Sequence, residues 1–391
     1  MALTLASAAD LLKEHHLLRE IIQGDVWTDD PARIASADEP FAGITYDTRK
    51  VTQGTLLCCK GRFKAEYLNG IDEAGLAAYV AETEYSAATA APGLIVNDAR
   101  KAMSLLSAAF YGYPQNELTV IGVTGTKGKT TTSYFTQALI NAVSGGKAAL
   151  FSSVDNCLDG HTYVESDLTT PESMDAFRMM REAADNGMEY LVMEVSSQAL
   201  AQKRVEGIRF KAAVFTNLTR DHLDYHGTFE NYAAAKHLLF ENSDLAVINV
   251  DDEAAQYMLS GTQCRNVTFS AKSDECDYSA KNIRVSAAGV KYELVSNDNI
   301  GRVDFAVPGE FSVYNSMGAA VCLVEMGYDF REVLDALSQC GGVPGRMELV
   351  KTDTPYSVII DYAHTPDGLE NVLTSVHEIT DGRVICVFGC G

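Results

Sequence analysis

Short apolar runs separated by helical stretches dominate the chain from about residue 118 to about 348. The runs lie at 118–123, 147–151, 190–195, 212–217 and 245–250. Runs as apolar as these predict strands buried on both faces, and helices between such strands are typical of a mostly parallel sheet with helices on both sides. The pattern therefore predicts an α/β domain in the middle of the chain.

The pattern changes between about 265 and 308, where polar and apolar residues alternate among Gly, Asn and Asp turns. Alternation with period two predicts antiparallel strands, here at 283–285 and 290–294, at one side of the sheet. Helices are expected at about 312–326 and 330–339.

The two ends of the chain predict further parts. Towards the N-terminus we expect an amphipathic helix at the start, strands at 41–46 and 54–59, helices at 71–78 and 99–110, and a linker at 113–117. Towards the C-terminus we expect a strand at 356–360, a helix at 365–377 and a strand at 383–388. Such a single βαβ unit cannot form a self-sufficient core, so we expect the polypeptide to lack most of a third domain. The expected domains are 1–116, 117–346 and 347–391.

Composition narrows the class of protein. The 391 residues, 47% of them hydrophobic, are enough for two or three domains. The formal net charge of -22 argues against a nucleic-acid partner, because binding to phosphate backbones needs a basic face. The nine cysteines form no C-x-x-C pair and indicate a reducing cytoplasm. The first residues are expected to form an amphipathic helix and not a signal peptide. The sequence has no apolar run of about 18 residues, so no membrane span is expected.

The segment Gly122-Val-Thr-Gly-Thr-Lys-Gly-Lys-Thr130 carries the strongest chemical signal. A strand that leads into a Gly-rich turn and then a helix is the geometry that binds a nucleoside triphosphate. Backbone N–H groups would hold phosphate oxygens, Lys129 would reach the β- and γ-phosphates, and Thr130 would offer its hydroxyl to Mg²⁺. Val123 stands where the general G-x-x-x-x-G-K-[ST] pattern has Gly, so the loop is a narrower variant.

Four further clusters lie at predicted strand ends or on the helix that follows, in the part of an α/β sheet where ligands bind. They are Leu168-Thr-Thr-Pro-Glu172, Met193-Glu-Val-Ser-Ser-Gln198, Asn217-Leu-Thr-Arg-Asp-His-Leu-Asp224 and Phe229-Glu-Asn-Tyr-Ala-Ala-Ala-Lys236. Glu194 sits inside an apolar strand, where a carboxylate is costly unless it is paired or binds a metal, so a Mg²⁺ ligand is the simplest explanation. The threonines at 169 and 170 suit either a substrate contact or a helix cap.

These motifs, in this order, resemble those of the Mur ligases of peptidoglycan synthesis, from about residue 41 to the end. Within that family the chain is most similar to the group that adds the third stem-peptide residue to UDP-MurNAc-L-Ala-D-Glu. The resemblance implies a cytoplasmic, monomeric, ATP-dependent ligase of cell-wall synthesis with an N-terminal UDP-binding domain, a central P-loop ATPase-like domain and a Rossmann-like C-terminal domain.

The resemblance also assigns site residues. It implies that ATP is bound by Gly125, Thr126, Lys127, Gly128, Lys129, Thr130, Thr131, Asn315, Arg346 and Asp361, and UDP-MurNAc-dipeptide by Thr48, Thr169, Thr170, Ser196, Gln202 and Arg204. One Mg²⁺ would be held by Thr130 and Glu194, and a second by His222 and Lys236. The family's counterpart of Lys236 carries a CO₂-derived carbamate, which turns an amine into a carboxylate able to bind Mg²⁺. The chain has Thr48 for the family's Ser, and Ser312 for the first Asn of its G-x-F-N-x-x-N pattern.

The implied reaction activates the D-Glu γ-carboxylate as an acyl phosphate, which an amino acid's amine then displaces. Lys127 and Gln198 favour L-lysine, because diaminopimelate-adding relatives more often have Asn and His there. The alternatives are a meso-diaminopimelate-adding ligase, a folylpolyglutamate synthase-like ligase and a P-loop NTPase that switches conformation.

Overall fold

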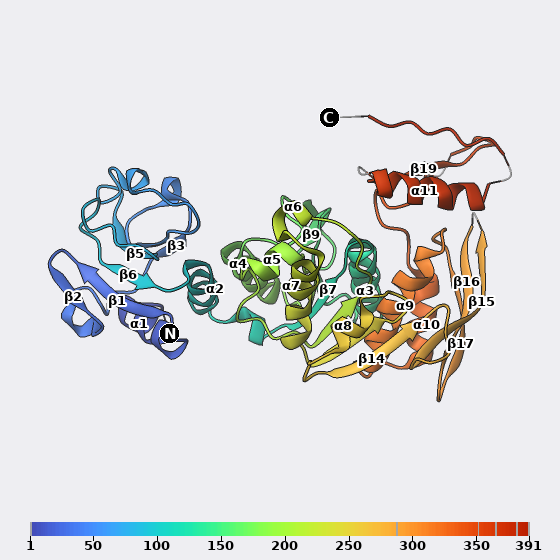
Figure 1. The fold of residues 1–391 in the computed structure, drawn as a ribbon, viewed down its shortest axis with the longest axis horizontal. Helices are drawn as coiled ribbons and strands as arrows, with labels where there is room; N and C mark the ends of the chain where they lie inside the picture. Colours follow the sequence, from blue (N-terminus) through green and yellow to red (C-terminus); the bar gives the residue numbers. More distant parts are fainter. Residues whose placement is uncertain (1, 287, 351, 364–365, 381, 390–391) are drawn as a thin grey trace. The chain divides into compact units, whose positions relative to one another are not determined.

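The computed structural model describes residues 2–286, 288–350, 352–363, 366–380 and 382–389, and the chain forms two compact units (Figure 1). Unit 1 comprises Met1–Leu118, Pro171–Asp185 and Gln198–Ile208; unit 2 comprises Thr119–Thr170, Asn186–Ser197 and Arg209–Gly391. The chain therefore leaves unit 1 at residue 118 and returns to it twice.

Unit 1 is built on a six-stranded sheet in the order β2-β1-β6-β5-β4-β3. Its strands are β1 (Leu18–Gln23), β2 (Val26–Thr28), β3 (Gly43–Thr45), β4 (Thr55–Cys58), β5 (Leu76–Ala81) and β6 (Gly93–Val96). The strands from β3 to β6 are parallel, and β1 pairs antiparallel with both β6 and β2. The helices are α1 (Leu5–Glu14), α2 (Ala99–Phe110) and α4 (Ser173–Asp185), with 3-10 turns η1 (Pro31–Arg33), η2 (Thr48–Lys50), η3 (Ala65–Leu68) and η4 (Pro114–Asn116).

Successive residues of the central strands of unit 1 enter two different cores. On β5, Ala78 and Val80 join the cluster that includes α1 and α2, whereas Tyr79 and Ala81 join a second cluster on the other face. Side chains alternate along a strand, so a strand that is apolar throughout must be covered on both faces. Met174 of α4 belongs to the first cluster, so the returning segment completes that core.

Unit 2 contains an eleven-stranded sheet in the order β10-β9-β8-β11-β7-β12-β13-β14-β15-β16-β17. Its strands are β7 (Thr119–Thr124), β8 (Ala148–Phe151), β9 (Asp155–Cys157), β10 (Tyr163–Glu165), β11 (Tyr190–Glu194), β12 (Ala212–Phe215), β13 (Leu245–Asn249), β14 (Arg265–Ser270), β15 (Tyr278–Ser286), β16 (Gly289–Ser296) and β17 (Ile300–Phe305). Its helices are α3 (Lys129–Ser144), α6 (Leu223–His226), α7 (Phe229–Glu241), α8 (Ala255–Leu259), α9 (Phe311–Glu325) and α10 (Phe330–Gln339), and α5 (Ser197–Ala201) spans the boundary to unit 1.

Helices cover both faces of this sheet at its centre. A Cβ on Gly122 of β7 would lie 3.0 Å from Leu239 of α7, whereas the next residue, Val123, belongs to the core formed with α3 and α9. The seven neighbouring strands β8, β11, β7, β12, β13, β14 and β15 are parallel. The short strands β9 and β10 extend the β8 edge in antiparallel pairing. At the other edge, β15, β16 and β17 are antiparallel beside α9 and α10 (Figure 1). The predicted α/β class, with a mostly parallel sheet and a small antiparallel part at one side, is confirmed.

Two sequence-based expectations are wrong. The segment expected as a helix at 71–78 is a turn followed by β5, because Gly70 and Gly75 have positive φ angles of 75° and 91° and interrupt any helix. The six residues that follow Gly75 form β5, a buried central strand.

The strand expected at 383–388 is absent among the described residues. Val387 is 92% exposed, and a strand cannot form without a neighbour for its backbone hydrogen bonds. The described part after Arg346 instead contains an antiparallel pair, β18 (Glu348–Val350) and β19 (Val358–Ile360), followed by α11 (Pro366–Glu378). Thr365, expected as the first residue of this helix, lies outside the described residues.

Candidate active site

The loop between β7 and α3 has glycine at the two positions where its backbone requires it. Gly125 and Gly128 have φ angles of 152° and 83°. A Cβ would lie 1.9 Å from Thr216 Oγ1 at the first and 2.5 Å from Asn315 Oδ1 at the second. The loop therefore closes tightly against two neighbouring segments, and α3 begins directly after it with the N–H groups of its first turn at the loop.

Two lysines from different elements meet at one carbonyl of this loop. Lys129 Nζ donates to the carbonyls of Gly125 and Thr126, at 3.1 Å each. Lys236 Nζ, on α7, donates to the same Gly125 oxygen at 2.7 Å and lies 4.8 Å from the centre of the Tyr232 ring. Burial lowers the pKa of Lys129. Burial and then the neighbouring Lys129 hold the pKa of Lys236, only 1% exposed, well below its usual range.

A buried carboxylate lies at the carboxyl end of β11, the strand that pairs with β7. Glu194, the last residue of β11, is fully buried. Its two oxygens accept from the N–H of Ser153 at 2.6 Å and from the hydroxyl of Ser153 at 3.0 Å. Both partners are neutral donors, which leave the negative charge available to a cation.

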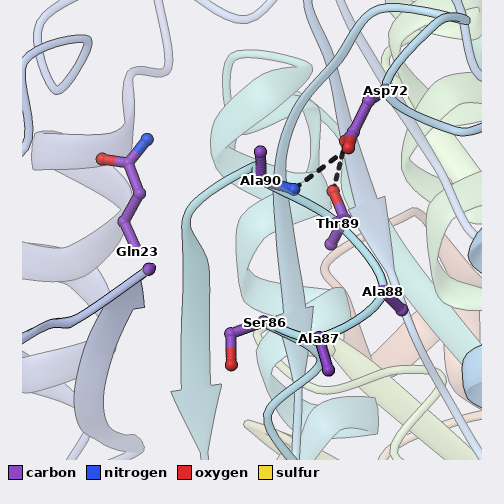
Figure 2. Close-up of a pocket in the computed structure, with 8 residues that line it drawn as sticks. Gln23, Asp72, Ser86, Ala87, Ala88, Thr89 and Ala90 are labelled. Carbon is purple, nitrogen blue, oxygen red and sulfur yellow. Dashed lines mark hydrogen bonds between the residues drawn. The ribbon is translucent and has the colours of Figure 1, made fainter.

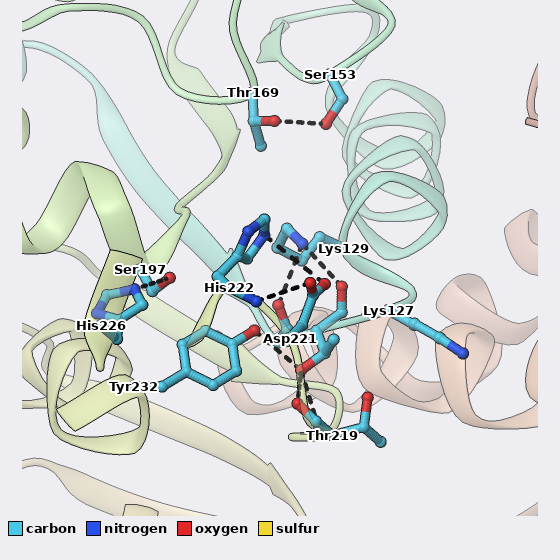
Figure 3. Close-up of polar contacts among 12 residues, drawn as sticks. Lys127, Lys129, Ser153, Thr169, Ser197, Thr219, Asp221, His222, His226 and Tyr232 are labelled. Atoms are coloured by element: carbon cyan, nitrogen blue, oxygen red, sulfur yellow. Dashed lines mark hydrogen bonds and ion pairs between the residues drawn. The ribbon is translucent and has the colours of Figure 1, made fainter. Parts of the chain in front are cut away.

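The threonines at 169 and 170 contact this carboxylate region. Thr169 Oγ1 accepts from Ser153 Oγ at 3.1 Å (Figure 3). Thr170 Oγ1 donates to the Glu194 carbonyl at 2.9 Å and accepts from the N–H of Ser196 at 3.0 Å. Predicted substrate and metal residues of unit 2 thus share one hydrogen-bond network.

The segment after β12 supports the loop from the other side. Asn217 Oδ1 accepts the N–H of Lys127 at 2.9 Å, and Thr216 donates to the Lys127 carbonyl at 2.6 Å. Farther along, His222 has a positive φ of 50°, and its Nε2 lies 3.7 Å from Asp221 Oδ2. Figure 3 shows these two side chains extending towards Lys129.

Residues late in the chain also reach the loop. Asn315 of α9 accepts from Thr132 Oγ1 at 3.3 Å, and Arg346 Nη2 donates to Thr130 Oγ1 at 3.4 Å. Asp361 accepts the backbone N–H groups of Met347 and Ala363, at 2.9 and 2.8 Å, so it shapes the turn that carries Arg346.

The remaining predicted substrate residues lie in unit 1. Thr48 begins the 3-10 turn η2, whose N-cap Asp47 accepts from the N–H and the guanidinium of Arg49. That arrangement lowers the pKa of Asp47 to about 2. Gln202 and Arg204 follow α5 and are joined by a hydrogen bond of 2.9 Å from Arg204 Nη2 to Gln202 Oε1.

Sequence reasoning missed Ser153 and Tyr232. Ser153 follows the carboxyl end of β8, where ligand contacts are expected, so strand position alone could have identified it. Tyr232 lies four residues before Lys236 and therefore on the same side of α7. Its hydroxyl is 3.0 Å from Thr126 Oγ1.

The side chains around the loop supply only some of the ligands that a Mg²⁺ ion needs. Among the described residues no group of three or more His, Cys, Asp or Glu side chains is placed to hold a metal ion. Mg²⁺ commonly takes one or two carboxylates and completes its shell with phosphate oxygens and water, so Glu194 with Thr130 suits a nucleotide-bound ion.

A separate pocket in unit 1 contains none of the predicted site residues (Figure 2). It is lined by Gln23, Gly24, Asp72, Ser86, Ala87, Ala88, Thr89 and Ala90. The Asp72 carboxylate already accepts from the Thr89 hydroxyl and the Ala90 N–H. In the described part of the chain, no helix is long and apolar enough to span a membrane.

Comparisons with known proteins show the family of this chain. The family model of the Mur ligase middle domain matches residues 123–323, and that of the Mur ligase glutamate ligase domain matches residues 345–391. A UDP-N-acetylmuramyl-tripeptide synthetase of Bifidobacterium longum is 63% identical over 390 residues, which cover 97% of this chain and 75% of the relative. A UDP-N-acetylmuramoyl-L-alanyl-D-glutamate–2,6-diaminopimelate ligase of Clostridium botulinum is 37% identical, covering 89% and 73%.

A solved structure of a UDP-N-acetylmuramoyl-L-alanyl-D-glutamate–2,6-diaminopimelate ligase has a TM-score of 0.80 and 29% identity, covering 100% of this chain and 77% of that one. The chain belongs to the Mur ligase family, whose members are ATP-dependent ligases that add an amino acid to a UDP-MurNAc peptide in peptidoglycan synthesis.

Proposed function

We propose that this protein adds L-lysine to the D-Glu γ-carboxylate of UDP-MurNAc-L-Ala-D-Glu, in the cytoplasm and at the expense of ATP. Residues 1–116 would bind the UDP-sugar, 117–346 would bind ATP, and 347–391 would begin the part that binds the amino acid. Family-model matches at 123–323 and 345–391 support the last two divisions.

The observation that carries the proposal is the meeting of Lys236 and Lys129 at the Gly125 carbonyl. Two ammonium groups buried this closely repel each other, which favours a neutral Lys236. A neutral amine attacks CO₂: the N–C bond forms, one C=O electron pair moves to oxygen, and the nitrogen releases a proton. The resulting carbamate keeps one N–H for Gly125 and places a negative charge where the amine was neutral.

The charge of the site then suits magnesium nucleotide. Thr130 and Glu194 would hold one Mg²⁺, and His222 with carbamylated Lys236 a second. Bound there, Mg²⁺ would neutralise the phosphate oxygens of ATP. Ser153 fixes both oxygens of Glu194, so the carboxylate is oriented before the ion arrives.

The loop and the UDP-sugar residues would bring the two reactants together. Lys129 and the N–H groups from Gly125 to Thr131 would bind the β- and γ-phosphates, with Asn315, Arg346 and Asp361 on the nucleotide side. Thr48, Thr169, Thr170, Ser196, Gln202 and Arg204 would bind the UDP-MurNAc-dipeptide. Attack of the γ-carboxylate on the γ-phosphate releases ADP and leaves an acyl phosphate, and the incoming amine then displaces inorganic phosphate.

The choice of L-lysine rests on Lys127 and Gln198, which are the residues more typical of the lysine-adding group. Relatives named for diaminopimelate addition are also similar to this chain, so meso-diaminopimelate is the second candidate.

Hydroxylamine trapping tests the first half of the reaction. With ATP and UDP-MurNAc-L-Ala-D-Glu, the acyl phosphate should be captured as the γ-glutamyl hydroxamate. Hydroxamate formation from a folyl-glutamate substrate in its place would overturn the proposal in favour of a folylpolyglutamate synthase-like ligase. ATP hydrolysis that is independent of any acceptor would favour an NTPase switch. Supplying L-lysine or meso-diaminopimelate then identifies the amino acid by the mass of the product.

A further inference from the structure

Unit 1 contains a partly buried carboxylate that joins two cations from distant parts of the chain. Glu172 lies just before α4, Lys60 lies just after β4, and Arg204 lies after α5. Their side chains are only 13%, 18% and 12% exposed. Glu172 Oε1 accepts from Arg204 Nη2 at 2.9 Å, and Glu172 Oε2 pairs with Lys60 Nζ. Each carboxylate oxygen therefore has its own cation.

The same guanidinium nitrogen has a second acceptor. Arg204 Nη2 also donates to Gln202 Oε1 at 2.9 Å, and Gln202 Oε1 accepts from Arg100 Nη1 at 3.2 Å. Two acceptors on one nitrogen fix the rotation of the planar guanidinium. An arginine side chain held in this way loses less conformational freedom when it binds an anion, because most of the ordering has already occurred.

Lys60 connects this arrangement to Tyr46, two residues before the predicted substrate residue Thr48. Its ammonium lies 4.2 Å from the centre of the Tyr46 ring, and the Tyr46 hydroxyl donates to Asp175 at 2.6 Å. In this cluster the three cations, Lys60, Arg100 and Arg204, outnumber the two carboxylates. A positive excess in a chain with a net charge of -22 suits an anionic ligand.

We propose that Glu172, with Lys60 as its second cation, is a positioning residue that orients Arg204 towards a carboxylate of the muramoyl-dipeptide. The inference rests on the proposed function, in which Arg204 binds that ligand. Glu172 itself repels an anion, so replacing it with the isosteric glutamine has two opposing effects. Simple electrostatics predicts tighter binding, whereas loss of Arg204 orientation predicts weaker binding.

Calorimetric titration of Glu172→Gln with UDP-MurNAc-L-Ala-D-Glu and with UDP alone separates these effects. We expect affinity for the complete ligand to fall about tenfold, the loss typical of one oriented charged contact, while affinity for UDP stays within twofold. Unchanged UDP affinity also reports that unit 1 is folded. Unchanged or tighter binding of the complete ligand, or an equal loss for UDP, would overturn the inference.

A matched control and a double-mutant cycle complete the test. Glu206→Gln breaks the Lys101–Glu206 pair of 2.9 Å in the same unit and should leave both affinities unchanged. Arg204→Met should weaken binding by itself, and adding Glu172→Gln to it should change affinity less than twofold. A full additional loss in that background would show that Glu172 does not act through Arg204. If Arg204→Met has no effect, the ligand role of Arg204 in the proposed function is wrong, and the inference falls with it.

Discussion

Replacing Lys236 with methionine should remove a specific pH dependence of stability. The amine is 1% exposed, and its pKa in the folded chain is held well below the value of about 10.4 expected in an unfolded chain. Between the folded-state pKa and about pH 10.4, the unfolded chain therefore binds more protons at this residue than the folded chain does. Stability consequently rises with pH, and the contribution is lost as pH falls towards the folded-state pKa.

A difference of one bound proton between the two states corresponds to roughly 1 kcal/mol per pH unit. The stability of the wild type should therefore rise relative to that of Lys236→Met as pH increases from 7.5 to 9.5, by up to this amount per pH unit. At pH 9.5 the variant loses a hydrogen bond of roughly 1 kcal/mol, but the Gly125 carbonyl keeps its bond from Lys129.

Urea unfolding at several pH values, in buffers purged of CO₂, measures this difference. Lys211→Met is the matched control, because Lys211 lies in the same unit with a side chain that is 57% exposed, and the substitution removes only a surface ion pair of 3.5 Å with Asp244. Its pH dependence should follow that of the wild type. Parallel curves for the wild type and Lys236→Met would refute the idea that Lys236 is buried as a neutral amine. Added bicarbonate should change the curve of the wild type and leave that of Lys236→Met unchanged.

Three other substitutions test the site. Ser153→Ala removes one of two hydrogen bonds to Glu194. The Mg²⁺ concentration needed for half-maximal hydroxamate formation should therefore rise severalfold. An unchanged Mg²⁺ requirement would exclude Glu194 from the metal site. Gly128→Ala places a Cβ against Asn315 Oδ1 on a backbone that has a positive φ at residue 128. We therefore expect urea unfolding to show a loss of stability of about 1–2 kcal/mol. Calorimetry should show at least tenfold weaker binding of ADP. Asp361→Ala frees two backbone N–H groups, and limited proteolysis should cut the surrounding turn faster; equal cleavage rates would contradict the bracing role.

The loop between β7 and α3 was predictable because its sequence pattern is local. Strand, glycines, lysine and helix follow one another within a few residues, and each has its own sequence signal. Burial was harder to predict. Lys236 has no local signal of its own, and its importance depends on the folding of α7 against the loop that contains Gly125.

The errors in secondary structure have the same origin. Residues 71–78 contain apolar positions that also suit a helix, and only pairing with β4 and β6 makes the second half a strand. The apolar run at 383–388 has strand propensity, but propensity without a neighbouring strand gives no sheet. The ion pairs of Glu172 could not be inferred from sequence because its partners, Lys60 and Arg204, are separated from it by 112 and 32 positions.

The double return of the chain to unit 1 also constrains the order of folding during synthesis. Met174 of α4 belongs to the same core as α1 and α2, and both acceptors of Arg204 Nη2 come from the returning segments. When residue 118 leaves the ribosome, this core therefore still lacks part of its apolar surface. Unit 1 can reach its final packing only after residue 208 has been made, by which time the first strands of unit 2 are already available. An excised fragment ending at residue 118 should accordingly be more prone to aggregation than one ending beyond 208.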